Sequence, residues 1–407
     1  MANDPLIALE IGTAKVRVLV GDVQQDGTLR IANTGECEAR GIRKGEVIDY
    51  QAALGSLREA IDKAEQEGDI DIGFLSLVLS GGETESLLNQ GHISITNTSN
   101  EPGDSISEED MKRAMKIASK PALSREREVV HALKRNYVVD NVPDRNPEGR
   151  FGYNLTAESL ILHSRRGSLE TLRRMIEDDM EIDCDAMYFS AVSAAQAVLT
   201  DELMKAGVLL IDLGAGTSDF IVYQDGAPTV AGSIAVGGDH VTHDISVGLN
   251  IARGQAEQIK VKHGSAIIDT MAATKTVSVP STAGFRGTVV KKAALHTIIH
   301  ARMEETFQLV KARLDEKGIG SRLGGGVVLV GGGACLQGAA DLAHRVFCMP
   351  AHIGKVNNTI CLPGSSESVQ YAATVGCLHL AKKRQDERGS IGLVPAWLQN
   401  FLRKSNG

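Results

Sequence analysis

Two segments of the chain share one plan: an apolar strand, a tight glycine turn and a second strand. The first, LIALEIGTAKVRVLVGD, begins at Leu6, and the second, VLLIDLGAGTSDFIVYQDG, begins at Val208. Alternation of apolar and polar residues around a glycine turn predicts a β-hairpin. A carboxylate stands at the end of each first strand, Glu10 in one copy and Asp212 in the other. We therefore expect two related hairpins that face each other across a cleft.

The turns carry residue types that phosphate binding requires. Glycines allow backbone N–H groups to approach phosphate oxygens. Thr13 and Thr217, which we place at matching positions, add hydroxyl donors, and Lys15 balances phosphate charge. Glu10 and Asp212 are expected to hold Mg²⁺ through water, because that ion keeps much of its hydration shell. Either hairpin alone has a simpler interpretation as an ordinary turn, but two copies favour a triphosphate site.

A third glycine-rich segment lies later in the chain. An apolar strand at 327–330 enters the triplet Gly331, Gly332 and Gly333, and an amphipathic helix is expected to follow. Such a turn leaves room for a flat base or sugar beside a helix N-terminus. A glycine turn between a strand and a helix is common in α/β folds, so this segment supports the two hairpins without proving the site.

Composition restricts the class of protein. Aromatic residues make up 4% of the chain and there are 43 glycines, which favours an aliphatic α/β core over an all-β sandwich. The net charge of −8 argues against general nucleic-acid binding. None of the six cysteines forms a Cys-x-x-Cys pair, so we expect reduced thiols in a cytosolic protein. The N-terminus has no basic run followed by an apolar run, so we expect no signal peptide.

The last residues form a distinct amphipathic segment. A helix that begins at Pro395 gathers apolar side chains on one arc and polar and basic side chains on the opposite arc. The apolar arc holds Trp397, Leu398, Phe401 and Leu402; the other holds Gln399, Asn400, Arg403 and Lys404. A terminal helix of this kind commonly docks on its own protein, but aromatic and basic residues on opposite arcs suit a membrane interface. We favour membrane binding by residues 391–407.

Five motifs resemble the FtsA family of bacterial cell-division proteins, which belongs to the actin-like ATPase superfamily. They are LEIGTAKV, RGIRKGEVID, VTHDISVGL, AEQIKVKHGSA and VVLVGGGACLQG, and the likeness covers nearly the whole chain in the same order. The resemblance implies an α/β, actin-like two-lobed ATPase fold with an FtsA-type inserted α/β subdomain and a C-terminal amphipathic helix.

The resemblance also implies a division of the chain into subdomains. The first core subdomain is expected at 1–82, 163–205 and 362–381, the inserted subdomain at 83–162, the second core subdomain at 206–240 and 325–361, the smaller lobe at 241–324, a linker at 382–390 and the membrane helix at 391–407. Within the insertion, Ser107 followed by three acidic residues predicts a capped helix N-terminus.

Nucleotide contacts follow from the resemblance, residue by residue. The first phosphate turn takes Gly12, Thr13 and Lys15; the second takes Asp212, Gly214, Gly216 and Thr217; a turn beside the nucleotide takes Gly237 and Gly238; the adenosine loop takes Gly331 to Gly333. Glu257 and Lys260 match positions that flank the ribose and adenine. On spacing alone, an ordinary solvated ion pair on one helix face is the better interpretation of these two residues, and only the surrounding match favours nucleotide contact.

Hydrolysis of ATP needs an oriented water molecule. Gln196, sixteen residues before Asp212, is the candidate for that role, with Glu10 and Asp212 as the other catalytic residues. The alternative is a glutamine on a helix surface. We expect ATP and Mg²⁺ to bind tightly, with slow hydrolysis or none.

The resemblance implies a role in division at the cytoplasmic face of the bacterial inner membrane. The expected partners are the C-terminal peptide of FtsZ on residues 241–324, further copies of the chain in filaments, membrane lipid and later division proteins, but no nucleic acid. The alternatives are a pilus-assembly-type actin homologue and, less favoured, a small-molecule kinase on the same fold.

Overall fold

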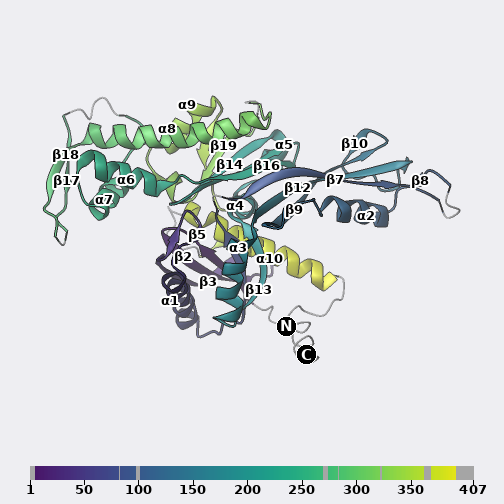
Figure 1. Cartoon of the computed structure of the whole chain (residues 1–407), viewed down its shortest axis with the longest axis horizontal. Coiled ribbons are helices and arrows are strands. Elements are labelled where there is room, and N and C mark those ends of the chain that lie inside the picture. Colours follow the sequence, from purple (N-terminus) through teal and green to yellow (C-terminus); the bar gives the residue numbers. More distant parts are fainter. Residues whose placement is uncertain are drawn as a thin grey trace.

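The computed structural model describes residues 5–81, 83–97, 101–268, 274–282, 284–320, 323–361 and 368–390 (Figure 1). The predicted membrane residues Trp397, Leu398, Phe401, Leu402, Arg403 and Lys404 lie outside these ranges. No helix in the described part of the chain is both long and apolar enough to cross a membrane.

The first large sheet has six strands in the order β13-β6-β1-β2-β3-β21. Its strands are β1 (Leu6–Ile11), β2 (Lys15–Val23), β3 (Leu29–Glu38), β6 (Phe74–Leu79), β13 (Asp183–Phe189) and β21 (Thr359–Ile360). One face packs on α1 (Tyr50–Gly68), α3 (Arg166–Arg173) and the π-helix Arg174–Asp178. Asp49 caps α1 by accepting the backbone N–H of Ala52.

The second large sheet has the order β16-β15-β14-β19-β20 and repeats the pairing of the first. In both, three antiparallel strands are followed by parallel additions next to the first strand. Its strands are β14 (Val208–Leu213), β15 (Ser218–Gln224), β16 (Ala227–Ile234), β19 (Val327–Val330) and β20 (Ala351–Ile353). The predicted pair of related hairpins is thus part of two similar sheets.

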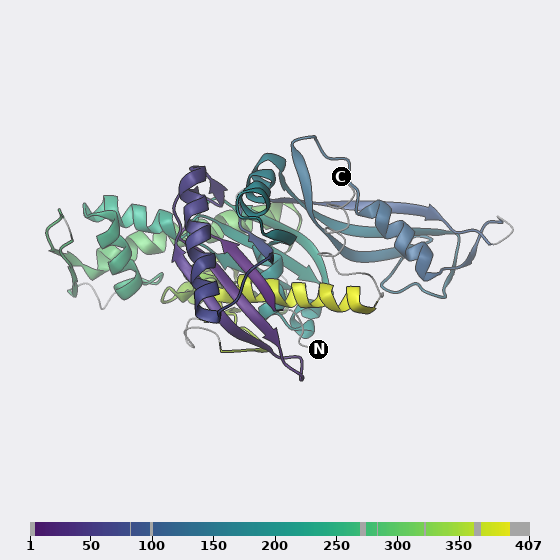
Figure 2. The same ribbon diagram turned by 90° about the horizontal axis from the view of Figure 1, so that it is seen from below.

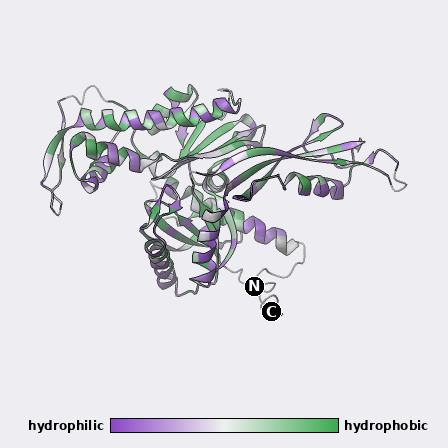
Figure 3. Ribbon diagram, viewed as in Figure 1, coloured by the Kyte–Doolittle hydropathy of each residue, from purple (hydrophilic) through white to green (hydrophobic). Residues whose placement is uncertain are grey.

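Two helices, α4 (Ser190–Val198) and α10 (Ala372–Ser390), join the sheets in one core. Gly376 permits their close crossing, since a Cβ there would lie 1.7 Å from the carbonyl oxygen of Ser193. Apolar residues concentrate in the central strands (Figure 3). Every residue of α4 except Gln196 is buried. The short helix α5 (Asp201–Ala206) leads from α4 towards β14.

A helical lobe extends from the second sheet (Figure 1). It contains α6 (Gly238–Leu249), α7 (Arg253–His263), the hairpin β17 (Thr276–Val279) and β18 (Thr288–Lys291), and α8 (Lys292–Glu316). Helix α8 is the longest of this lobe in the described residues, and its buried side includes Leu295, Ile299, Phe307 and Val310. Helix α9 (Ala339–Phe347) packs beside α8, and Phe307 meets Phe347 edge to face.

The inserted segment projects from the opposite end of the molecule (Figures 1 and 2). Its elements are β7 (Glu85–Ser94), β8 (Asp104–Ser105), α2 (Glu108–Ala118), β9 (Arg127–Val139), β10 (Val142–Asp144), β11 (Phe151–Gly152) and β12 (Asn154–Arg165). It has its own apolar core. Ser107 caps α2 as predicted, and its capping box is completed by Asp110.

Candidate functional site

The two glycine turns have the same hydrogen-bonded geometry. The N–H of Gly12 donates to the carbonyl of Lys15, and that of Gly214 donates to the carbonyl of Thr217, both over 3.0 Å. Glu10 pairs across its hairpin with a residue seven positions later, and so does Asp212. The two strand-end carboxylates therefore occupy equivalent positions.

The two threonines do not match, and this prediction was wrong. The strand register aligns Thr13 with Ala215, and it aligns Thr217 with Lys15. Thr13 is the second residue of its turn, whereas Thr217 is the fourth and begins the returning backbone. Each turn contains one threonine, and composition without register could not reveal the two-residue offset.

The turns from the two sheets touch each other. A Cβ added to Gly216 would lie 2.2 Å from Oγ1 of Thr13 and 2.9 Å from Cα of Lys44. The same Thr13 oxygen accepts a hydrogen bond of 3.2 Å from the backbone N–H of Gly45. Gly216 is therefore the point at which only a residue without a side chain lets the turns meet.

Asp212, which is partly buried, forms an acidic group with the buried Asp219 and with Glu10. Burial, with the charges of Asp219 and Glu10, raises the pKa of Asp212 to about 8. Burial also raises the pKa of Asp219 to about 7, although hydrogen bonds from Ser190 and Ser233 oppose the increase. The Ser190 hydroxyl donates to Oδ2 of Asp219 over 2.6 Å. Near neutral pH the group therefore retains protons and can exchange them for a bound cation.

Sequence reasoning missed Asp219 and Ser190. Asp219 lies directly across the hairpin from Asp212, in a register that depends on which residues form the turn. Ser190 begins α4, and nothing local in the sequence connects it with β15.

Glu10 has one partner from the C-terminal part of the chain and one from the neighbouring strand β2. The hydroxyl of Thr374 donates to Glu10, and Arg17 lies 3.7 Å from the same carboxylate. Arg17 also bonds Glu36 over 2.7 Å. Lys15, predicted to balance phosphate charge, is half-exposed and pairs with Glu36. To contact a phosphate, Lys15 would therefore have to leave Glu36.

The glycine triplet lies against the second hairpin. Gly331 has φ +83°, and a Cβ there would lie 2.3 Å from Oδ1 of Asp212. A Cβ on Gly333 would lie 2.8 Å from Cβ of Leu213, whereas Gly332 has open space around it. The triplet and the second turn thus form one continuous backbone surface.

The remaining expected contacts gather on the other side of that turn. Gly238 donates its N–H to the carbonyl of Gly214 over 3.0 Å. Lys260 reaches the carbonyl of Gly238 over 3.2 Å and pairs with Glu257 over 2.7 Å. Gly237 precedes Gly238 at the start of α6, and its Cβ position lies 2.6 Å from the Gly214 carbonyl oxygen. Glu257 and Lys260 therefore form an i,i+3 pair that also lies beside the second turn.

Gln196 is exposed on α4, six residues after Ser190. Within the described residues, no hydrogen bond joins Gln196 to Glu10, Asp212 or Asp219. Its assignment to water positioning stays a prediction. The same ranges contain no group of three or more His, Cys, Asp or Glu side chains placed to bind a metal directly.

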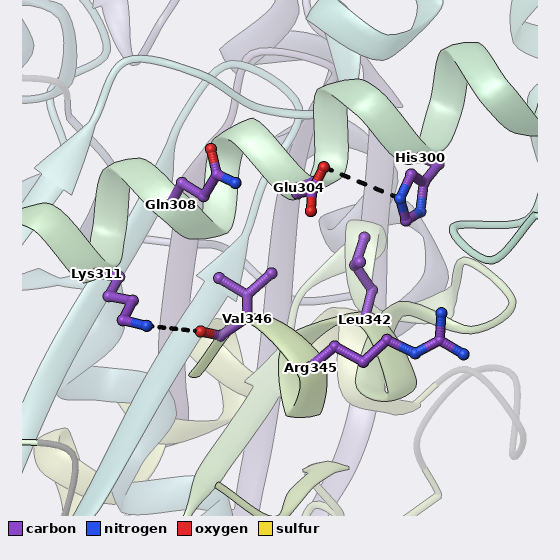
Figure 4. A pocket seen from close by; sticks show the side chains of 7 residues that line it. All are labelled: His300, Glu304, Gln308, Lys311, Leu342, Arg345 and Val346. Carbon is purple, nitrogen blue, oxygen red and sulfur yellow. Dashed lines mark hydrogen bonds and ion pairs between the residues drawn. The ribbon is translucent and has the colours of Figure 1, made fainter. Parts of the chain in front are cut away.

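A separate cavity of about 310 Å³ lies between α8 and α9 (Figure 4). Its walls include His300, Glu304, Lys311 and Arg345, and Lys311 donates to the carbonyl of Val346 over 2.9 Å. None of its lining residues belongs to the glycine turns, so it is not part of the predicted phosphate site.

Sequence comparison places this architecture in a known family. A family model described as "Cell division protein FtsA" matches residues 209–376, and one described as "SHS2 domain inserted in FTSA" matches residues 81–163. Cell division protein FtsA of Borreliella burgdorferi is 32% identical, with 87% of this chain and 85% of that protein covered. The chain belongs to the FtsA family of cell division proteins. FtsA of Escherichia coli is 30% identical, with 98% and 97% covered.

Solved structures with a similar fold are more distant in sequence from this FtsA-family chain. The "PilM-PilN type IV pilus biogenesis complex" matches with a TM-score of 0.60 at 12% identity, covering 92% of this chain and 98% of that one. MreB5 of Spiroplasma citri bound to ADP matches with a TM-score of 0.55 at 15% identity, covering 94% and 98%. The predicted family and the two-lobed actin-like α/β fold with its inserted subdomain are confirmed.

Proposed function

We propose that this FtsA-family protein binds ATP and Mg²⁺ at the meeting point of its two glycine turns. The observation that carries the proposal is the contact between the equivalent turns beside the partly buried Asp212. Backbone N–H groups of the turns would hold phosphate oxygens, and Gly331 to Gly333 would border the adenosine. Mg²⁺ would supply positive charge beside Glu10 and Asp212, held through water.

The raised pKa of Asp212 supports a cation at this position. A divalent ion favours the ionised carboxylate, so binding of ATP with Mg²⁺ should release protons near neutral pH. Calorimetry in two buffers of different ionisation enthalpy measures that release. Asp212→Asn should weaken ATP binding at least about tenfold and abolish most of the proton release. Asp62→Asn, an exposed change on α1, is the matched control. Unchanged affinity in Asp212→Asn would refute the site.

Gln196 is proposed to position water for a slow hydrolysis step. Gln196→Ala should then lower phosphate release while leaving ATP affinity unchanged. Because Gln196 is exposed on α4, the substitution should also leave the melting temperature unchanged. Equal rates of phosphate release in the two proteins would remove Gln196 from the site.

Residues 391–407 are proposed to attach the protein to the cytoplasmic face of the inner membrane at the division site. The opposed arcs of apolar and basic residues support this role, with each basic residue contributing up to about 1 kcal/mol near anionic lipid. Removal of residues 391–407 should abolish pelleting of the protein with anionic vesicles. Trp397→Ser should weaken pelleting, while Gln399→Ser on the polar arc should not. Equal pelleting of full-length and shortened protein would contradict the proposal.

The helical lobe at 241–324 is proposed to bind the C-terminal peptide of FtsZ. The nucleotide-bound protein is proposed to form filaments, which later division proteins join. Membership in a cell-division family supports both roles. Co-sedimentation with FtsZ on vesicles, in ATP and in ADP, tests them. The pilus-assembly alternative, which shares the fold of the PilM–PilN complex, predicts no binding of FtsZ.

A further inference from the structure

A second cavity, of about 400 Å³, lies where the first sheet, the inserted subdomain and α10 meet. Its walls are residues 129–132 of β9, residues 184–188 of β13, and side chains from three helical segments. These side chains are Leu169, Arg173, Glu177 and Arg384. We call this space the β9–β13 slot.

Two strand edges face the slot. β13 is the outer strand of the six-stranded sheet. β12 pairs with β9 on its other side, while β10 covers β9 only at residues 137–139. In the described part of the chain, residues 129–132 therefore have strand pairing on one side only. Unpaired strand edges beside a cavity are a template for an added segment.

His131 lines the slot and connects its two strands. The N–H of Phe189 donates to Nε2 of His131 over 2.9 Å, and the ring stacks on Tyr188 with centroids 5.8 Å apart. Burial lowers the pKa of His131 to about 4, so the ring is neutral and accepts this bond at neutral pH. Within the described residues, this hydrogen bond joins the two strands, and the cavity lies beside it.

Two departures from regular structure shape the walls. Glu177 belongs to the π-helix Arg174–Asp178, and the pairing of β13 shifts register between Cys184 and Ala186. A π-helix and a bulge each leave backbone groups outside the regular pattern and are frequent at functional sites. Their meeting at one cavity is a second observation, independent of the open edges, that points to a ligand.

The chain itself supplies a segment within reach of the slot. Arg384 of α10 lines the cavity and pairs with Asp185 over 3.6 Å. The six residues from Arg384 to Ser390 rise about 9 Å along the helix. Seven further residues lead to Trp397, and they can span up to about 23 Å when extended. Residues 391–407 are therefore long enough to return to the slot.

The chemistry of that segment complements the walls. Apolar residues of both strands accept an indole, which buries roughly 150–250 Å² when enclosed. Asp185 and Arg173 of the walls already have ion-pair partners, Arg384 and Glu128. In the described part of the chain no ion pair holds Glu177, which therefore remains able to meet the basic Arg403 or Lys404 of the segment. Docking of a terminal amphipathic segment on its own protein is also a common arrangement for such helices.

We propose that residues 391–407 dock in the β9–β13 slot, with Trp397 inside it, when no membrane is present. The regulatory consequence rests on the proposed membrane role of the same residues. Docked and lipid-bound forms exclude each other, so the apparent membrane affinity equals the intrinsic affinity multiplied by the fraction of undocked protein. The tether keeps the effective concentration of the segment high without any second molecule.

Trp397 is the only tryptophan, so its fluorescence reports the segment directly in the full-length protein. Without lipid, the wild type should show blue-shifted emission and protection from acrylamide. Glu177→Lys should make Trp397 about threefold or more easier to quench, because it repels Arg403 and Lys404. Asp178→Lys makes the same charge change one residue away, outside the lining, and should behave as the wild type. Ala186→Phe, which fills the slot, should match Glu177→Lys.

Vesicle titration provides the second arm. Glu177→Lys should bind anionic vesicles about threefold or more tightly than Asp178→Lys, since less of the segment is docked. If vesicles alter neither Trp397 emission nor pelleting in any variant, the membrane role fails while lipid-free protection still tests docking. Equal quenching in wild type, Glu177→Lys and Asp178→Lys would overturn the docking proposal. Protection that rises with protein concentration would overturn it as well, because the occupant would be a second copy.

Discussion

Asp212→Asn should stabilise the protein without nucleotide while it weakens nucleotide binding. The carboxyl of Asp212 keeps its proton in the folded protein up to about pH 8, but in the unfolded chain it ionises above 3.8. Between these values the unfolded state holds fewer protons, so the free energy of unfolding falls as the pH rises from about 4 to about 8. The difference between the two pKa values sets an upper limit of about 6 kcal/mol on this loss in the free energy of unfolding. Replacement by a neutral amide removes this loss.

Differential scanning calorimetry from pH 5 to pH 9, without nucleotide, measures the effect. The melting temperature of Asp212→Asn should exceed that of the wild type by several degrees at pH 8, and the difference should shrink towards pH 5. Asp62→Asn on the exposed side of α1 should follow the wild type at every pH. Parallel pH profiles for Asp212→Asn and the wild type would refute the reasoning, because the titration of the Asp212 carboxyl would then make no contribution to stability.

Two further substitutions test the contacts around this carboxyl. Gly216→Ala should lower ATP affinity at least about tenfold in calorimetry, because its methyl group would lie 2.2 Å from Oγ1 of Thr13; Gly254→Ala, with open space around it, is the matched control. Ser190→Ala removes a hydrogen bond that lowers the pKa of Asp219, so stability should fall by about 1–2 kcal/mol, and more at pH 8 than at pH 5. Equal melting curves for Ser190→Ala and the wild type at both pH values would contradict that account.

The sequence predicted those parts of the site that depend on local pattern. Glycine between alternating strands gave both turns, and the equivalence of Glu10 and Asp212 followed from strand ends that can be seen in the residues themselves. The capped start of α2 at Ser107 was predictable for the same reason, since a cap and its first turn are neighbours in the chain. Each of these features is decided within about ten residues.

Register and long-range packing decided the rest. The equivalence of Thr13 and Ala215 in the two hairpins depends on which residues form each turn. Alternation of apolar and polar residues does not specify this. Ser190 reaches Asp219 only because α4 crosses the second sheet after leaving the first. Thr374, which bonds Glu10, is separated from it by 364 positions. Such contacts are a consequence of the assembled core rather than of any short motif.

Ser86 shows why the β9–β13 slot in particular is invisible in the sequence. A serine in an alternating strand resembles an outward-facing residue, yet its hydroxyl accepts the N–H of Ala231 over 3.0 Å and donates to the carbonyl of the same residue. These two hydrogen bonds fix β7 of the inserted subdomain to the edge of the second sheet at β16. With β7 fixed there, β12 and then β9 follow through the sheet, and the start of β9 comes to lie beside β13. The slot is therefore a product of how the insertion docks, and a change at Ser86 should alter it without touching any residue that lines it.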